Sequence, residues 1–389
     1  MKMCLKCIKY ILCAVCCYVL LLTLVFLIPD KGIQGHREEA LSYIEEEGEY
    51  PKPFFESASA RLDNVTDHIM IQKTQPESEN VLISAMNPAY ARYWHGYLVF
   101  LRPLLLFFDY FQIRFLGYCV STTLLFLLFG LVLKHEGWGV SMALAASAIL
   151  VRFIVVPVSL QFASSFNVML IFCIWVLWKR EKIKTGEIQL AVPFAIAGSV
   201  VNFLDFLTAP LVTLGVPLVL CILILMKSGK NSWKSNVAEV IKDSFYWVLG
   251  YGLTWFSKWF CATLILKNNI FLDAFRTILF RVDGNQEYPV NRIMAIGKNI
   301  FFLMGTDGIK ILFPILAALL ICVIVMMWKY RTKAVELLPL LLIACMPYVW
   351  YFVLANHSGI HGFFTYRVQM ITVFAGGVML DLLWKWRTK

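Results

Sequence analysis

The chain has 389 residues, of which 60% are hydrophobic and 15% are charged, and its formal net charge is +10. Soluble globular domains are about 45–50% apolar and about 25% charged, so this composition excludes a soluble fold and predicts an all-α polytopic membrane protein. The positive charge is no sign of nucleic-acid binding, because Lys and Arg in membrane proteins mark the cytoplasmic loops.

Apolar runs long enough to cross a bilayer recur along the chain. The first, about residues 8–28, follows three lysines and precedes no small-x-small cleavage site, which predicts a retained signal anchor. The segment 97–112 is apolar but contains Arg102 and Pro103, and it is predicted to be an interfacial or re-entrant helix and not a span. Nine further runs are predicted to span the membrane, at 113–133, 139–157, 159–178, 188–207, 208–226, 245–266, 309–328, 334–355 and 364–384.

The distribution of Lys and Arg orients these ten spans. With the N-terminus in the cytosol, every even-numbered span ends in a basic loop or tail, and the short turns near Pro157, Thr208 and 356–363 contain no Lys or Arg. The positive-inside rule then predicts a multi-pass plasma-membrane protein with both termini in the cytosol. One membrane domain, 1–389, would carry a first exoplasmic loop at 30–96 and a second at 267–308.

Residues 61–68 of the first exoplasmic loop bring together four side chains with catalytic potential. Asp63 and Asp67 lie four residues apart, so a helix here would place both carboxylates on one face. Either carboxylate is a candidate general base toward a sugar hydroxyl, with Arg61 and His68 positioning the substrate. The alternative is a solvated acidic loop in which these residues form a turn or a helix cap.

Four charged side chains lie in the outward halves of predicted spans, where a charge in hydrocarbon is costly and needs a reason. They are Arg152, Asp205, Lys258 and Arg367. One interpretation is structural pairing, for example of Asp205 with Arg152 or Lys258. The other is a basic pocket at the outer leaflet, in which the three cations bind a lipid-linked phosphate and Asp205 helps to position the substrate.

The turn between the last two predicted spans carries polar side chains that a simple connection does not need. His357 and His361 lie four residues apart, and Tyr366 follows at the start of the last span. The histidines are predicted to bind the donor phosphate, and Tyr366 to position the substrate. As the alternative, the histidines together with the carboxylates of the first loop would hold a divalent metal.

The segment Arg92-Tyr93-Trp94-His95-Gly96-Tyr97 opens the interfacial stretch with aromatic and basic side chains. Such side chains anchor a helix at the level of the lipid headgroups. A gate for a lipid substrate is the second interpretation, and in it Arg92 and His95 position the substrate.

Sequence motifs for soluble cofactors are absent from the chain: there is no P-loop, GxGxxG, GxSxG or HExxH. No predicted cytoplasmic segment is long enough to bind ATP or a nucleotide sugar. A transferase of this kind would therefore use a lipid-linked donor at the outer face, with membrane lipids around it and no nucleic acid.

Three clusters carry a resemblance to the GT-C superfamily of integral-membrane glycosyltransferases: Arg61-Leu-Asp63-Asn64-x-Thr66-Asp67, Arg92-Tyr93-Trp94-His95-Gly96-Tyr97 and Asn356-His357-Ser358-x-x-His361. The same clusters resemble those of Gram-positive bacterial membrane proteins. The resemblance implies a catalytic aspartate in the long first exoplasmic loop, at Asp63 or Asp67, and further helices around a polyprenyl-phosphate-sugar site. The first loop departs from the family pattern because it contains no Asp-x-Asp, Asp-Asp or Glu-Asp.

The leading hypothesis is a glycosyltransferase that moves a sugar from a polyprenyl-phosphate donor to a cell-surface glycan or lipid acceptor at the outer face. A lipid-linked glycan flippase or other transporter is the first alternative, and it would need no general base. A polysaccharide polymerase or ligase is the second, although its chief outer loop usually lies late in the chain.

Overall fold

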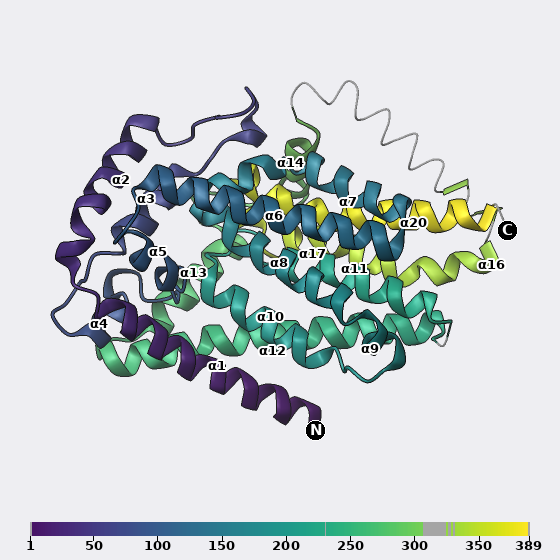
Figure 1. The fold of residues 1–389 in the computed structure, drawn as a ribbon, viewed down its shortest axis with the longest axis horizontal. Helices are drawn as coiled ribbons and strands as arrows, with labels where there is room; N and C mark the ends of the chain where they lie inside the picture. The colour runs from purple at the N-terminus through teal and green to yellow at the C-terminus, as the bar shows by residue number, and fades with distance from the viewer. Residues whose placement is uncertain (1, 230, 306–323, 326–327, 330, 388–389) are drawn as a thin grey trace.

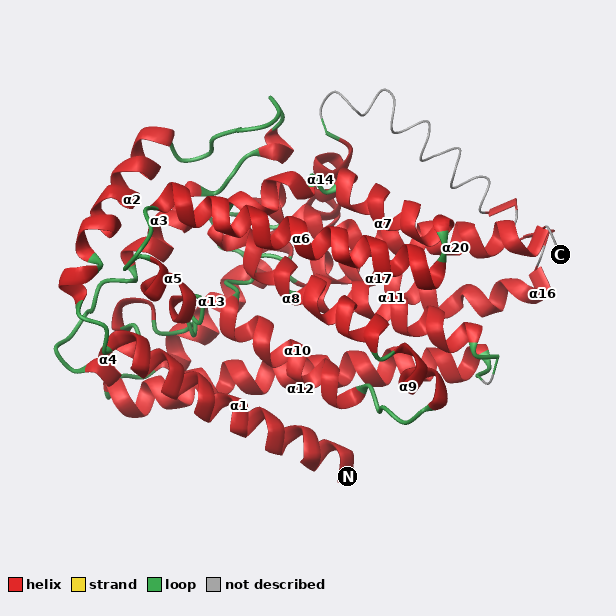
Figure 2. Ribbon diagram, viewed as in Figure 1, coloured by secondary structure: helices red, strands yellow, loops and turns green. Residues whose placement is uncertain are grey.

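The computed structural model describes residues 2–229, 231–305, 324–325, 328–329 and 331–387. Within these residues the chain is all-α, with short 3₁₀ turns, one isolated bridge between Gly284 and Pro289 and no β-strand (Figures 1 and 2). The predicted fold class is confirmed at this level. Most of the predicted run 309–328 lies outside the described residues.

Five helical segments of the described chain are long and apolar enough to cross a membrane, and three shorter helices are also apolar. This pattern indicates a multi-pass membrane protein. The five are α1 (Lys2–Phe26), α6 (Tyr110–Glu136), α8 (Leu160–Trp178), the segment Val335–Val353 that ends in α17 (Leu338–Val353), and Gly362–Trp386, which contains α19 (Gly362–Thr365) and most of α20 (Met370–Arg387). The three shorter helices are α7 (Trp138–Leu150), α10 (Ala191–Leu204) and α11 (Val212–Lys227).

The long helix α12 (Trp233–Leu266) runs side by side with α10 (Figure 1). Two glycines make the close approach possible, because a Cβ at Gly198 would overlap the carbonyl of Trp247 and a Cβ at Gly250 would overlap the carbonyl of Ala195. Small residues at such crossings let membrane helices pack backbone to backbone.

The remaining helices connect these long elements. Several of the first-loop helices and α13 gather at one end of the molecule, on the left of Figure 1, and α9 and α16 lie toward the other end. The connecting helices are α2 (Gln34–Glu47), α3 (Asn64–Gln72), α4 (Val81–Ala85), α5 (Leu98–Leu104), α9 (Arg180–Thr185), α13 (Ile270–Asp283), α14 (Arg292–Met304), α16 (Arg331–Ala334) and α18 (Ala355–Ile360).

The predicted interfacial helix 97–112 differs in the structure. Only the short α5 forms there, and α6 begins at Tyr110 behind a capping box. Arg102 of α5 is fully buried and donates hydrogen bonds to the backbone carbonyls of Val25, Ile28 and Thr74. It therefore ties α5 to the end of α1 and cannot reach lipid headgroups, because no part of its side chain is exposed.

Candidate functional site

Asp67 joins the first loop to α8. Its side chain is fully buried, and each carboxylate oxygen faces one backbone N–H at the start of α8: Oδ2 accepts from Leu160 (3.0 Å) and Oδ1 from Gln161 (3.0 Å). The hydroxyls of Tyr110 and Ser159 donate to the same carboxylate. Burial raises the pKa of Asp67 to about 6, although Arg114 and the two N–H groups favour its charged form. These contacts assign Asp67 to capping α8.

Asp63 occupies a different position, immediately before α3. It is the N-cap of that helix, and its carboxylate accepts hydrogen bonds from the N–H (3.2 Å) and the hydroxyl (2.9 Å) of Thr66. Burial raises the pKa of Asp63, and the contacts with Thr66 and the charge of Arg61 partly oppose this. Asp63 lies outside the helix, so the expected pair of carboxylates on one helical face is not formed.

Arg61 connects the loop of Asp63 to α19, at the start of the last long helical segment. Its guanidinium lies 4.9 Å from the ring centre of Tyr50 and 4.0 Å from that of Phe363. Arginine stacks on aromatic rings in this way through cation–π attraction. His68 is not part of this contact, since it faces Glu45 of α2 at 3.4 Å.

Two of the charged groups inside the predicted spans, Lys258 and Asp205, are held by structural contacts. The buried Lys258 donates to the carbonyl of Met86 (2.9 Å). Asp205 accepts from the hydroxyl of Ser165 (2.8 Å) and from the N–H of Thr208 (2.8 Å). The suggested pairing of Asp205 with Arg152 or Lys258 is therefore not formed, because uncharged donors bind Asp205 and backbone carbonyls bind both cations.

Tyr366 and Arg367 are also buried at contacts between the first loop and the last long helical segment. The Tyr366 hydroxyl lies 2.9 Å from the carbonyl of Ser59 and 3.0 Å from that of Val151. Arg367 donates to the carbonyls of Phe363 (3.0 Å) and Ser59 (3.1 Å). Both side chains are at most 1% exposed. These contacts explain them as structural residues, and a phosphate has no access to them.

His95 is likewise buried. Its Nε2 lies 2.9 Å from the carbonyl of Tyr90, and its Nδ1 lies 3.2 Å from the hydroxyl of Tyr97. A carbonyl only accepts, so Nε2 carries the proton and Nδ1 accepts from the tyrosine. Burial lowers the pKa of His95 well below its usual value, and the ring stays neutral in the fold.

A cavity of about 320 Å³ between α13 and α18 collects several basic groups. We call it the basic cavity. No Asp or Glu lines it among the described residues, and its own lining residues are Arg92, Arg276, Thr277, Phe280, Arg281, Asn356, His357, Ile360 and His361. Cations and N–H donors concentrated around one hollow, without lining carboxylates, are suited to binding an anion.

His357 and Arg281 form a fixed pair on the wall of the basic cavity. Arg281 Nη1 lies 2.7 Å from His357 Nδ1, and His357 Nε2 lies 2.9 Å from the carbonyl of Leu207. A guanidinium can only donate, so Nδ1 accepts and Nε2 carries the proton. Burial and the charge of Arg281 lower the pKa of His357 well below its usual value. His357 therefore holds Arg281 in place, and both of its nitrogens are occupied.

Two other groups of the basic cavity, His361 and Arg276, are less constrained. His361 stacks on Phe364, with 5.1 Å between ring centres, and burial, Arg281 and Lys298 lower its pKa to about 4. Arg276 has no carboxylate partner within 4 Å in the described chain, whereas Arg92 pairs with the half-exposed Asp273 at 2.9 Å. A neutral His361 and the arginines all present N–H donors to an anion.

Arg276 and Arg281 were not among the site residues predicted from the sequence. Both belong to α13, whose exposed apolar side chains Leu272, Phe275 and Leu279 lie at helical spacing. The helical spacing of apolar residues over 270–283 indicates an amphipathic helix, and this helix also carries Arg276 and Arg281. It would not have revealed the neighbouring turn of His357, which is distant in sequence.

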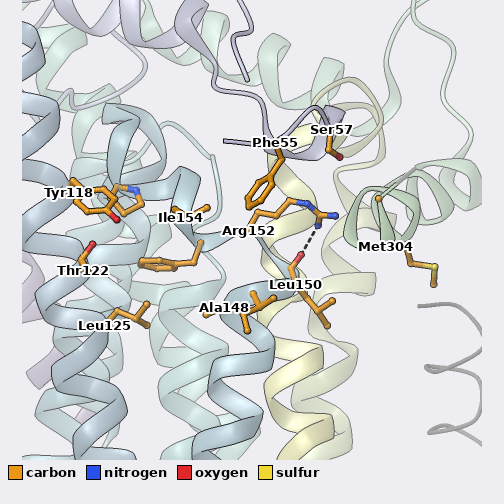
Figure 3. A pocket seen from close by; sticks show the side chains of 14 residues that line it. Phe55, Ser57, Tyr118, Thr122, Leu125, Ala148, Leu150, Arg152, Ile154 and Met304 are labelled. Carbon is orange, nitrogen blue, oxygen red and sulfur yellow. Dashed lines mark hydrogen bonds between the residues drawn. The ribbon is translucent and has the colours of Figure 1, made fainter. Parts of the chain in front are cut away.

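Arg152 lies at a second, larger cavity of about 630 Å³ (Figure 3). Tyr118, Thr122 and Leu125 of α6 line one side of it, and Arg152 lies beside Phe55 and Ser57 on the other. This Arg152 cavity shares no described lining residue with the basic cavity. The residues predicted to bind the donor phosphate are thus divided between two cavities and the protein interior.

The predicted metal alternative required the last-turn histidines and the first-loop carboxylates in one cluster. Across the described residues, no group of three or more His, Cys, Asp or Glu side chains is arranged to hold a metal ion. Both nitrogens of His357 and both oxygens of Asp67 already have partners in the protein.

No protein-family model matches the chain, and the comparisons with curated proteins and with solved structures likewise give no match.

Proposed function

We propose that the protein is a GT-C-like glycosyltransferase that moves a sugar from a polyprenyl-phosphate donor to a cell-surface glycan or lipid acceptor. In this proposal the chain has ten spans, both termini are cytosolic, and the basic cavity opens on the outer side of the plasma membrane. The positive-inside pattern supports this orientation. The observation that carries the proposal is the basic cavity, with three arginines and two histidines around one hollow.

The basic cavity suits a phosphate leaving group. When the bond between the sugar C1 and the phosphate oxygen breaks, the electron pair stays on the phosphate and its negative charge grows. Preorganised donors stabilise such a charge more strongly in the transition state than in the ground state. Arg276, Arg281 and His361 would supply these donors, while His357 keeps Arg281 in position.

Asp63 is the proposed general base. It would accept the proton of the acceptor hydroxyl while the acceptor oxygen forms its bond to C1 from the side opposite the phosphate, so the configuration at C1 inverts. A carboxylate with a raised pKa is a stronger base near neutral pH. Burial raises the pKa of Asp63, which makes its carboxylate a stronger base. Asp63 does not itself line the basic cavity, but its loop contacts the turn that follows His361 through the stacking of Arg61 on Phe363.

An in vitro transfer assay tests the phosphate site. Purified protein is mixed with radiolabelled short-chain polyprenyl-phosphate sugars and membrane extract, and label in a new product is followed. We expect Arg281→Gln to lower transfer by about 10²–10³-fold, the usual effect of removing a donor to a developing oxyanion. The matched control is Arg292→Gln on α14, an arginine that pairs with Asp283 outside the cavity lining. Equal transfer by the Arg281 and Arg292 variants would exclude the basic cavity as the phosphate site.

The same assay separates the transferase from a flippase. A flippase would move the labelled lipid between leaflets without forming a new bond, and it would not need Asp63. The flippase alternative would be favoured if the intact donor moves between leaflets while no combination of donor and acceptor extract yields a labelled product.

A further inference from the structure

The Arg152 cavity is apolar apart from one cation and a few hydroxyls. Its apolar lining comes mainly from α6, α7 and the 3₁₀ segment η4 (Phe153–Val158), with Phe55 of the first loop and Met304 of α14. Its volume of about 630 Å³ lies within the range of about 300–1,000 Å³ typical of small-molecule sites. Ile149, one of the lining residues, has a side chain 73% exposed at the protein surface. Next to a bilayer, such a cavity is suited to hydrocarbon.

Arg152 is held in an unusual conformation at the rim. Its φ of 52° is in the left-handed region, which costs roughly 1–2 kcal/mol for a residue with a Cβ. Nη1 donates to the carbonyls of Leu150 (2.8 Å) and Leu303 (3.0 Å), which fixes the guanidinium. A Cβ at Gly305 would come within 2.5 Å of Nη2, so a glycine there leaves room for the guanidinium. The surrounding fold thus maintains Arg152 in a strained backbone conformation at the rim of this cavity.

The guanidinium keeps donors for a ligand. Among the described residues Arg152 has no Asp or Glu partner within 4 Å, and its hydrogen bonds there are made by Nη1 alone, which leaves Nε and Nη2 without a protein acceptor. The hydroxyls of Tyr118 and Thr122, one turn apart on α6, also lack hydrogen-bond partners among the described residues and line the same cavity. An anionic group at Arg152 with an attached chain would satisfy both the cation and the apolar wall.

We propose that the Arg152 cavity binds one membrane lipid with an anionic headgroup, its phosphate on Arg152 and its chain against the apolar wall. This site is distinct from the basic cavity and does not depend on the transferase proposal. A free phosphate offers the same charge but leaves the apolar wall uncovered. The structure therefore favours a lipid over inorganic phosphate.

Native mass spectrometry of the purified full-length protein tests this site. The protein is titrated with phosphatidylglycerol, which is anionic, and with phosphatidylcholine, which is zwitterionic, each with and without inorganic phosphate. We expect the wild type to prefer the anionic lipid at least tenfold, with little competition from inorganic phosphate. Arg152→Gln should lower the affinity for phosphatidylglycerol about tenfold, because one charge-assisted hydrogen-bonding group is lost.

A second variant and two controls keep the result interpretable. Thr122→Phe fills the cavity and should weaken binding of both lipids, while thermal unfolding checks that each variant is folded. Arg292→Gln and Arg281→Gln, which lie outside the lining of the Arg152 cavity, should both bind lipid as the wild type does. The proposal is overturned if the wild type binds both lipids equally, if Arg152→Gln and Thr122→Phe leave binding unchanged, or if inorganic phosphate displaces the lipid at equimolar concentration.

Discussion

Changing each first-loop aspartate to asparagine should separate a structural carboxylate from a catalytic one. In Asp67→Asn, one of the two carboxylate oxygens becomes an NH₂ group. Each oxygen of Asp67 faces a backbone N–H, that of Leu160 or that of Gln161. Neither N–H can reverse its role, so whichever way the asparagine turns, one donor meets another in a fully buried site. The loss of hydrogen bonds and the unsatisfied donor should cost about 2–4 kcal/mol of folding free energy.

Asp63→Asn meets no such conflict. The asparagine Oδ1 can still accept from the N–H of Thr66, and its NH₂ group can donate to the Thr66 hydroxyl, which both donates and accepts. Asparagine is also as good an N-cap as aspartate, so the folding free energy should change by less than about 0.5 kcal/mol. Thermal and denaturant unfolding in detergent, followed by tryptophan fluorescence, measures both variants. Equal destabilisation by the two substitutions would refute this account of the loop.

Three further results are expected. A double-mutant cycle of Arg281→Gln and His357→Ala, measured on the binding free energy of a polyprenyl-phosphate analogue, should show a coupling of about 1–2 kcal/mol. Additive losses of binding free energy would contradict the positioning role of His357. His361 takes up its proton near pH 4 in the fold but near 6.5 when unfolded, so stability should fall as pH drops through this window. His361→Gln should flatten that fall in thermal unfolding, and an unchanged slope would refute the assignment. Gly250→Ala should lower the folding free energy by about 1–3 kcal/mol, because the added Cβ pushes α12 away from α10. Gly252→Ala places its Cβ in open space and should not destabilise the fold. Similar melting temperatures for the two variants would refute the close packing of α10 against α12.

The sequence was most informative about helices. Hydropathy located α1, α6, α8 and the last two long helical segments, because a bilayer demands long apolar runs whatever their neighbours are. It was misleading at 97–112, where apolar composition suggested one interfacial helix. There the buried Arg102 and the capping box at the start of α6 divide the segment.

The candidate site was less predictable, because residue types do not reveal partners. Asp67 and Asp205 have the residue type expected of functional carboxylates. In the fold both are buried and accept hydrogen bonds from backbone N–H groups, Asp67 at the start of α8 and Asp205 in the loop that follows α10. His357 was found as a polar residue in the last turn, but its role depends on Arg281, which is 76 positions away. Such contacts arise only from tertiary packing.

The transfer of labelled sugar by the wild type and by Asp63→Asn tests the central claim most directly. The proposal predicts a labelled product with the wild type, and a decrease of roughly 10²–10⁴-fold in Asp63→Asn at unchanged folding stability. A folded Asp63→Asn variant with wild-type turnover would contradict Asp63 as the base. A well-folded wild type that forms no product from any polyprenyl-phosphate sugar, with acceptor extract present, would contradict the transferase itself.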